Sequence, residues 1–355
     1  MSKLLPSIAM SLALLVPSLA CAEDAVSVRL PTTDGVTLRG EFHPGTKKSA
    51  CVLLLHDLGE ERHEKQWQGF AKMLAAQGFA VLQFDFRGQG RSTEVEPEVF
   101  WSNSYAANRR LVKNSGNKEE IAFQSFSSSY HPYLINDIAA AKAFLDRKND
   151  AGLCNSGNLI VISSGRSGAL AAGWINAEMH RFRRLPQDFF GAPLQLAETP
   201  EGVHVLCALF IDLTPNVGKS KLSLSSTLRA AAGRKVPFVF FHGRDDAAAR
   251  SVAKETEKAI NPGGKNELTG VTAIPGEKLS DVENRILTDK GLEKDIVRYL
   301  KQVQDERGRE WEEQDTRDTT YFWRNPYAPA SVIQFNQPGN NAPPFASYEL
   351  FLPAR

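Results

Sequence analysis

The sequence predicts an α/β fold, in which helices cover both faces of a mostly parallel central sheet. Residues 50–55 form an uninterrupted apolar run, Ala-Cys-Val-Leu-Leu-Leu, which is typical of a strand that is buried on both faces. Residues 60–77 carry apolar side chains at helical spacing, and residues 79–85 form the next apolar run. A strand, a helix and a strand in this order predict a parallel βαβ unit.

The same alternation of strand and helix patterns extends along the chain. Residues 26–42 alternate apolar and polar side chains around Asp34-Gly35, which predicts an antiparallel hairpin. Further strands are predicted at residues 158–162, 204–211, 236–241 and 271–274, and further helices at residues 132–147, 168–180, 252–260 and 281–303. Only a short segment joins the strands at 204–211 and 236–241, so we expect no large cap domain there.

Two segments interrupt this pattern. Residues 93–131 are polar around a few aromatic side chains, and we interpret them as an insertion or long loop that overhangs one end of the sheet. Residues 305–355 begin with a dense mixture of charges, typical of a linker or solvated helix end, and continue as a tail rich in Pro, Asn and aromatic residues. Because disordered tails are usually poor in aromatic residues, we expect this tail to dock, either on its own domain or on a partner or second copy.

The bulk composition is that of an ordinary globular protein. A chain of 355 residues, 42% hydrophobic and 23% charged, is long enough for one large α/β domain. Its 42 Lys and Arg residues balance 41 Asp and Glu residues. The charge therefore gives no reason to expect nucleic acid or an anionic membrane as a partner.

Residues 1–22 predict a secretory signal peptide. Lys3 supplies a short basic start, residues 8–19 form an apolar run too short to span a bilayer comfortably, and residues 20–22 (Ala-Cys-Ala) fit a small-x-small cleavage site. The mature domain, residues 23–304, would then be exported to a periplasm or out of the cell. The alternatives are a lipid anchor at Cys21, although Ser18 stands where lipoprotein signals place Leu or Val, and a single N-terminal membrane helix.

Cleavage after Ala22 would leave three cysteines, Cys51, Cys154 and Cys207. An odd number of cysteines cannot pair fully within one chain. Cys51 and Cys207 lie inside apolar strand-like runs, and we interpret them as buried small apolar side chains. The chain has no CxxC, no HExxH and no clustered His and Cys, so we expect no metal and no cofactor.

Two motifs carry a resemblance to a known family. Residues 53–59, Leu-Leu-Leu-His-Asp-Leu-Gly, resemble the strand and oxyanion loop of α/β-hydrolases, with His56-Asp57 in place of the usual His-Gly. Residues 78–92 resemble the following strand and its Arg-Gly-x-Gly-x-Ser turn. The resemblance covers residues 25–304 and implies an α/β-hydrolase fold, whose catalytic residues follow the order nucleophile, acid, histidine.

The nucleophile elbow of that fold reads Gly-x-Ser-x-Gly, and residues 163–169, Ser-Ser-Gly-Arg-Ser-Gly-Ala, stand in its place. Two registers are open. In the first, Arg166 occupies the nucleophile position and Gly168 keeps the tight contact between strand and helix. In the second, Ser167 is the nucleophile and Ala169 replaces the last glycine. We prefer the first register, and neither gives an intact motif.

The resemblance places the triad acid at Asp246, in the turn His-Gly-Arg-Asp-Asp of residues 242–246. The alternative is that Asp246 only caps the helix that follows. The triad histidine is missing: no histidine follows His242, and Leu279 stands where the family has its Gly-x-x-His turn. A serine hydroxyl is a weak nucleophile without a base, so a working site would have to recruit His56 or Lys278.

Loss of one triad member typically lowers turnover on the order of 10⁴- to 10⁶-fold. What remains would come from oxyanion donors, here the backbone N–H groups of Leu58 and of the residue after the elbow tip. The leading hypothesis is therefore an exported protein that binds an unidentified small molecule or protein rather than cleaving it. The alternatives are a serine ester or peptide hydrolase that uses Ser167 with an unusual base, and an interaction protein that works through its tail.

The resemblance also predicts where these residues meet. Ligands of open α/β sheets bind at the carboxyl ends of the strands, and five side chains are expected to converge there: His56, Asp57, Arg166, Ser167 and Asp246. We further expect Arg166 to pair with Asp246, or else to offer its charge to a ligand carboxylate.

Overall fold

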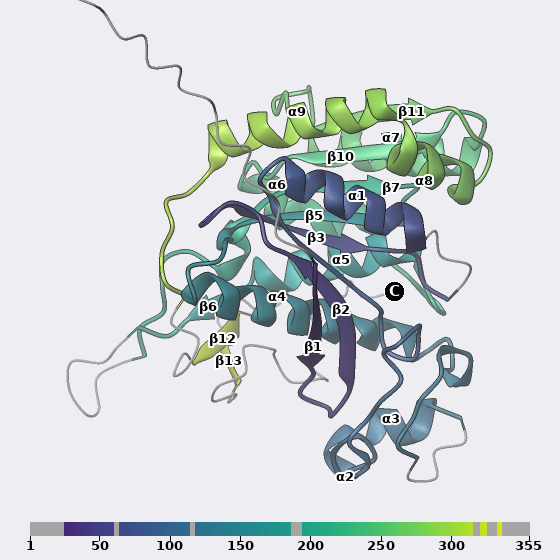
Figure 1. Ribbon diagram of the computed structural model, residues 1–355, viewed down its shortest axis with the longest axis vertical. Helices are drawn as coiled ribbons and strands as arrows, with labels where there is room; N and C mark the ends of the chain where they lie inside the picture. The colour runs from purple at the N-terminus through teal and green to yellow at the C-terminus, as the bar shows by residue number, and fades with distance from the viewer. Residues whose placement is uncertain are drawn as a thin grey trace, which may run out of the picture.

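The structure, a computed structural model, describes residues 25–59, 64–113, 118–185, 194–314, 320–324 and 332–335. At its centre lies an eight-stranded sheet with the strand order β1-β2-β4-β3-β5-β7-β10-β11 (Figure 1). β1 is antiparallel to β2, and β2 to β4, whereas the other neighbours are parallel, which confirms the predicted mostly parallel sheet. The strands are β1 (Val26–Pro31), β2 (Thr37–His43), β3 (Ala50–Leu55), β4 (Ala80–Phe84), β5 (Asn155–Ser164), β7 (Val205–Ile211), β10 (Phe238–Gly243) and β11 (Gly270–Ile274).

Helices cover both faces of this sheet, as predicted (Figure 1). One face packs against α1 (Glu64–Ala76), α8 (Leu279–Thr288) and α9 (Lys290–Arg307). The other packs against α4 (Ile135–Asp150), α5 (Arg166–Glu178), α6 (Leu224–Gly233) and α7 (Ala247–Ile260). A short ribbon of β8 (Asn216–Val217) and β9 (Ser220–Lys221) precedes α6, so the segment between β7 and β10, all of which is described, holds no large cap domain.

The prediction of one continuous helix over residues 281–303 is wrong. The chain breaks at Asp289, whose backbone is extended (φ −80°, ψ 113°). The Asp289 carboxylate accepts hydrogen bonds from the backbone N–H groups of Gly291 and Leu292, and it thereby caps a new helix, α9. The apolar period continues across the break, which is why the sequence pattern did not reveal it.

The segment between β4 and α4 contains short helices where the sequence predicted a long loop or insertion. They are α2 (Pro97–Phe100), α3 (Ala106–Leu111) and single 3₁₀ turns at Asn103–Tyr105, Phe123–Ser125 and His131–Leu134. A buried ion-pair network anchors this segment. Arg87 is fully buried and contacts Asp34 and Asp137 at 2.6 Å each. Its Nη1 also donates to the Tyr130 hydroxyl at 3.0 Å, which joins the end of the segment to the β1–β2 turn and to α4.

The C-terminal segment docks on its own domain. β6 (Arg181–Arg183), β12 (Tyr321–Arg324) and β13 (Val332–Phe335) form a three-stranded antiparallel sheet, and the Trp323 side chain is fully buried. Of the two expectations for the tail, docking on the same chain is thus confirmed for residues 321–324. The tail beyond residue 335 lies outside the described residues.

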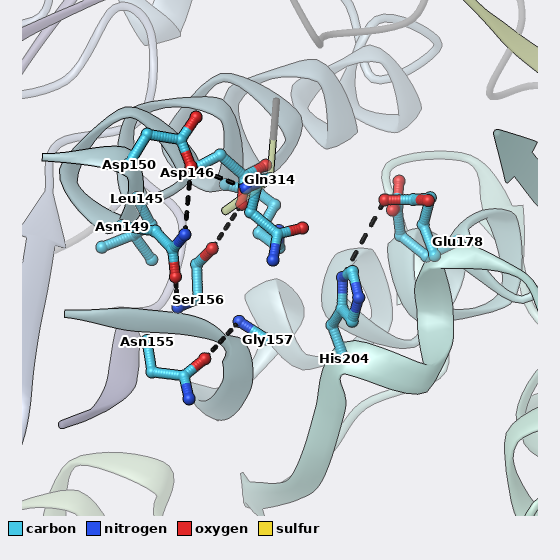
Figure 2. Close-up of polar contacts among 12 residues, drawn as sticks. Leu145, Asp146, Asn149, Asp150, Asn155, Ser156, Gly157, Glu178, His204 and Gln314 are labelled. Carbon is cyan, nitrogen blue, oxygen red and sulfur yellow. Dashed lines mark hydrogen bonds and ion pairs between the residues drawn. The ribbon is translucent and has the colours of Figure 1, made fainter. Parts of the chain in front are cut away.

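The chain that leads to β12 follows the end of α4 and the start of β5. The N–H of Arg309 donates to Asn158 Oδ1 at 2.8 Å, and the N–H of Gln314 donates to Asp150 Oδ1 at 2.7 Å. Figure 2 shows Gln314 beside Asp146 and Asp150 of α4. Within the predicted linker, residues 305–307 therefore belong to α9, and residues 309–314 are hydrogen-bonded to the end of α4 and the start of β5.

None of the helices in the described segments is long and apolar enough to cross a membrane. The predicted signal peptide, with Cys21, precedes the first described residue.

Candidate functional site

The turn between β5 and α5 has the geometry of a nucleophile elbow, and its tip is Gly165. β5 ends at Ser164, α5 begins at Arg166, and Gly165 between them has φ 56° and ψ −122°. This left-handed backbone is a conformation that glycine tolerates far better than other residues. Both registers expected from the sequence, with Arg166 or Ser167 at the tip, are therefore wrong. The strand runs two residues further, and the helix starts two residues earlier, than the apolar pattern indicated.

Two side chains from other loops fill the space above the tip. A Cβ atom added to Gly165 would lie 2.5 Å from Asp57 Oδ1 and 2.7 Å from Leu279 Cδ2. Asp57 belongs to the loop after β3, and Leu279 is the first residue of α8. The position predicted to have lost its histidine is thus directly beside the elbow, and leucine packs there.

Asp57 also binds the first residue of α5. The backbone N–H of Arg166 donates to Asp57 Oδ1 at 2.7 Å, and the Arg166 guanidinium donates to Oδ2 at 3.0 Å. The side chains are about one-third and one-fifth exposed, so this pair lies at the protein surface rather than in the core. The expected partner of Arg166 was Asp246, and that expectation is wrong: the hydrogen-bonded carboxylate is Asp57.

Ser167 points into the protein interior. Its side chain is fully buried, and its hydroxyl lies 2.9 Å from the carbonyl oxygen of Leu55 and 2.8 Å from that of Ser164. The neighbouring Gly168 is tightly packed, because a Cβ there would lie 2.7 Å from Leu213 Cδ1, just after β7, and 3.4 Å from Phe210 Cδ1 in β7. The expected tight contact at Gly168 is confirmed, whereas Ser167 is not displayed at the site.

Asp246 has the capping role that the sequence left open as an alternative. Its Oδ1 accepts a hydrogen bond from the N–H of Ala249, at the start of α7. A second carboxylate, Asp212, lies near it at the end of β7, with φ 50° and only 8% exposed. Burial raises the pKa of Asp212, and the charge of Asp246 adds to this effect. Sequence analysis missed Asp212, because only the folded chain brings the ends of β7 and β10 together.

His56 is turned away from the elbow. Its Nδ1 donates to the carbonyl oxygen of Asp57 at 2.6 Å, and its Nε2 lies 3.9 Å from Asp85 Oδ1, after β4. The ring packs edge-on against Phe86. Leu58, the expected oxyanion donor, has a fully buried side chain. Of the five side chains expected to converge, Asp57 and Arg166 meet, whereas His56, Ser167 and Asp246 are each engaged elsewhere.

The segment after β4 covers this end of the sheet, as predicted. A Cβ on Gly59 would lie 2.4 Å from the Phe123 ring, so Phe123 rests directly on the loop that holds Asp57. The His131 ring stacks on Phe123, with 5.0 Å between centroids. Burial lowers the pKa of His131, and the nearby charge of Arg166 lowers it further. The sequence analysis assigned neither Phe123 nor His131 to the site, and the structure packs both against the loop that holds Asp57.

The order of the eight strands and the strand–turn–helix at Gly165 decide the fold. The chain has the α/β-hydrolase fold. It is similar to an esterase of Pyrococcus furiosus, at 14% identity and a TM-score of 0.49, over 79% of this chain and 90% of that one. A dienelactone hydrolase from Anabaena variabilis is 13% identical, with a TM-score of 0.49 over 81% and 99% of the two chains. No protein-family model and no curated protein matches the sequence.

Within the α/β-hydrolase fold, the three triad positions can now be named from the geometry. Gly165 is at the nucleophile position, Leu279 packs beside it where the histidine is expected, and Asp246 occupies the acid turn. A glycine offers no nucleophile, and a leucine can neither take nor give a proton. Across the described segments, no three His, Cys, Asp or Glu side chains are grouped to hold a metal ion.

Proposed function

We propose that this protein is an exported α/β-hydrolase-fold protein that has lost serine-hydrolase catalysis and acts by binding, as a ligand receptor or a scaffold. The observation that carries the proposal is Gly165 at the elbow tip, with Asp57 and Leu279 packed where a serine side chain would stand. The nucleophile and its base are both replaced by residues without titratable groups. A single substitution would not restore the pair, because the space is also occupied.

The backbone donor that would stabilise the oxyanion is blocked as well. In working α/β-hydrolases the backbone N–H of the residue after the nucleophile stabilises the oxyanion. Here that residue is Arg166, and its N–H is bound to the Asp57 carboxylate at 2.7 Å. A carboxylate fixed at this position repels a second developing negative charge, so it opposes the transition state of acyl transfer.

The geometry argues against the serine-hydrolase alternative. Ser167 is fully buried, and its hydroxyl lies within hydrogen-bonding distance of two carbonyl oxygens. His56 is turned toward Asp85. Lys278 is exposed immediately before α8, and its backbone N–H donates to the Asp281 carboxylate. The tail alternative gains no support from residues 321–324, since these form β12 inside the protein's own sheet.

The donors around Asp57 suggest the chemistry of a ligand. One backbone N–H and one guanidinium are already arranged about a carboxylate, and the Arg166 side chain is about one-third exposed. We therefore propose that the ligand, a small molecule or a segment of a protein, presents a carboxylate that replaces that of Asp57.

Loss of catalysis is tested by fluorophosphonate labelling and short-chain ester turnover of the purified mature protein, beside Ser167→Ala. We expect no labelling and no turnover of either protein, while an active serine hydrolase added to the same mixture is labelled. Labelling or turnover that disappears in Ser167→Ala would overturn the proposal and restore the enzyme. Export is tested separately by N-terminal sequencing of the protein from the cell envelope or medium, which should begin near Glu23.

A further inference from the structure

Cys51 and Cys154 lie together in the core. Cys51 is the second residue of β3, and Cys154 immediately precedes β5. The starts of these strands are neighbours, since Ala50 pairs with Asn155, whose N–H donates to the carbonyl oxygen of Ser49 at 2.7 Å. Both cysteine side chains are fully buried on the face that α4 covers, and both are free thiols in the structure. Cys154 lies close enough to Cys51 to contribute to raising the pKa of its thiol.

We propose that Cys51 and Cys154 form a disulfide bond when the exported chain folds. The inference rests on the proposed export, because disulfides form and persist in oxidising compartments. It also accounts for the odd number of cysteines in the mature chain. Cys207 is buried among the side chains of the opposite face of the sheet, beside α1 and α9, and remains a thiol.

The bond forms by thiol–disulfide exchange with a disulfide-bearing oxidant of the export compartment. The thiolate of one cysteine attacks the oxidant, and a mixed disulfide results as the oxidant's own S–S bond breaks. The second thiolate then displaces the oxidant, which leaves as a dithiol. The two protein thiols lose two protons and two electrons, and the oxidant gains them.

Burial determines when this step occurs. Burial raises the pKa of the Cys51 thiol well above its ordinary value, and both sulfurs are closed off from solvent in the folded chain. In the closed structure Cys154 Sγ donates to the carbonyl oxygen of Leu145, on α4, at 3.6 Å. An oxidant therefore reaches the pair only before α4 packs on β3 and β5. For the same reason a reductant should not reach the finished bond under native conditions.

The bond closes a loop of about 100 residues, a length at which a cross-link restricts the unfolded chain strongly. We therefore expect the oxidised protein to unfold several degrees above the reduced one. We also expect dithiothreitol to cleave the bond in urea but not in buffer alone.

The test is a non-reducing tryptic map of the mature full-length protein, unfolded in the presence of an alkylating reagent. Residues 49–62 and 149–166 are the tryptic peptides that contain Cys51 and Cys154, and residues 185–219 contain Cys207. We expect the first two peptides to be linked, two hydrogens lighter than their sum, and the third to be alkylated. Three alkylated peptides, or a bond that includes Cys207, would overturn the proposal.

Two variants and a refolding experiment distinguish failure of the proposed disulfide from failure of the proposed export. Cys207→Ser should retain the linked peptide, and Cys154→Ser should leave Cys51 alkylated. The reduced chain is also refolded from urea with oxidised glutathione, which tests the pairing without the cell. If refolding yields no linked peptide, the proposed disulfide fails whatever the cellular location. If the N-terminus shows that the signal segment is retained inside the cell, the export proposal fails instead.

Discussion

The carboxylate of Asp57 accepts a hydrogen bond from the backbone N–H of Arg166, 2.7 Å away. This contact joins the loop after β3 to the first residue of α5, on either side of the elbow tip. The protein therefore places a negative charge of its own where an α/β-hydrolase stabilises the charge of its reaction. An ordinary glycine at this loop position would leave the N–H open to a substrate.

The first prediction concerns Asp57→Ala. This substitution should destabilise the protein by about 1–2 kcal/mol, because it removes the three hydrogen bonds that Arg166 donates to a partly exposed carboxylate. The variant leaves a carboxylate-shaped space between two donors. Added formate should therefore restore part of the lost stability, by about 1 kcal/mol at five times its dissociation constant. Urea unfolding with formate, and with chloride at the same ionic strength, measures the effect.

Two controls make the formate result specific. Asp57→Asn keeps a carbonyl acceptor in the space, so it should lose less stability and gain nothing from formate. Arg29, which pairs with Glu94 at the surface, offers an ion pair outside the site, and Arg29→Ala should leave stability nearly unchanged. Equal stabilisation of all variants by formate would show a general salt effect and contradict the prediction.

The second prediction concerns Gly165→Ser, the substitution that nominally restores a nucleophile. It should destabilise the protein by about 2–4 kcal/mol, because the backbone is left-handed (φ 56°) and the new Cβ meets both Asp57 and Leu279. No esterase activity should appear, since Leu279 provides no base. Urea unfolding and ester turnover of the purified variant give the two readouts.

Gly152→Ser is the matched control for backbone strain. Gly152 also has a positive φ, 74°, but a Cβ there would meet nothing within 4 Å. The difference between the two glycine variants therefore measures the steric conflict above the elbow. Adding Asp57→Gly to Gly165→Ser should recover on the order of 1 kcal/mol, since it removes one of the two obstacles. If the two substitutions change the free energy of unfolding in a purely additive way, Asp57 does not obstruct a side chain at position 165.

Periodicity sufficed to predict most of the fold. The β1–β2 hairpin, the βαβ unit and the later strands follow from side-chain spacing, which depends on burial alone. Asp289 shows the limit of this reasoning, because a side-chain cap divides a helix without disturbing its apolar face. β6 and β12 were missed for another reason: each is four residues or fewer, and their pairing joins segments that are distant in sequence.

The site was less predictable than the fold. The absence of the triad histidine could be inferred from the sequence, because no histidine follows His242, and Leu279 does lie beside the elbow. The residue at the elbow tip could not be inferred in this way. Ser163 and Ser164 end the apolar pattern, although both belong to β5 and are fully buried. Only the backbone angles identify Gly165. The partner of Arg166 depends in turn on how the Asp57 loop folds over that tip.

The third prediction concerns the tail. Trp323→Ala should destabilise the protein by about 3–5 kcal/mol, because the side chain is fully buried in the main core. Trp311 is the control on the same segment: it is only partly buried, and Lys48 Nζ lies 3.8 Å above its ring. Trp311→Ala should cost about 1 kcal/mol. Thermal unfolding that is unchanged by Trp323→Ala would show that β12 does not stabilise the domain.

The last prediction concerns pH and His204, whose Nδ1 lies 3.9 Å from a carboxylate oxygen of Glu201. Burial lowers the pKa of His204 to about 4, although the nearby Glu201 carboxylate opposes the shift. The unfolded chain takes up this proton at pH values below about 6.5, whereas the folded chain stays neutral there until about pH 4. Acid therefore favours the unfolded chain across that window.

His204→Gln removes this proton uptake, so the variant should lose less stability than the native protein between pH 6.5 and pH 4. The difference should reach up to about 3 kcal/mol near pH 4. Comparison of the two proteins cancels the other buried histidines, His43, His131 and His180, whose pKa values burial also lowers. The pKa of Glu201 is about 2 in the folded chain, because the charges of His204, Arg183 and Arg181 outweigh the effect of its burial. The stability that the Glu201 carboxylate contributes is therefore lost only below about pH 4.5. Urea unfolding at pH 7, 6 and 5 therefore measures the effect of His204 alone. If the free energy of unfolding falls equally with pH in the two proteins, His204 is not buried in its neutral form.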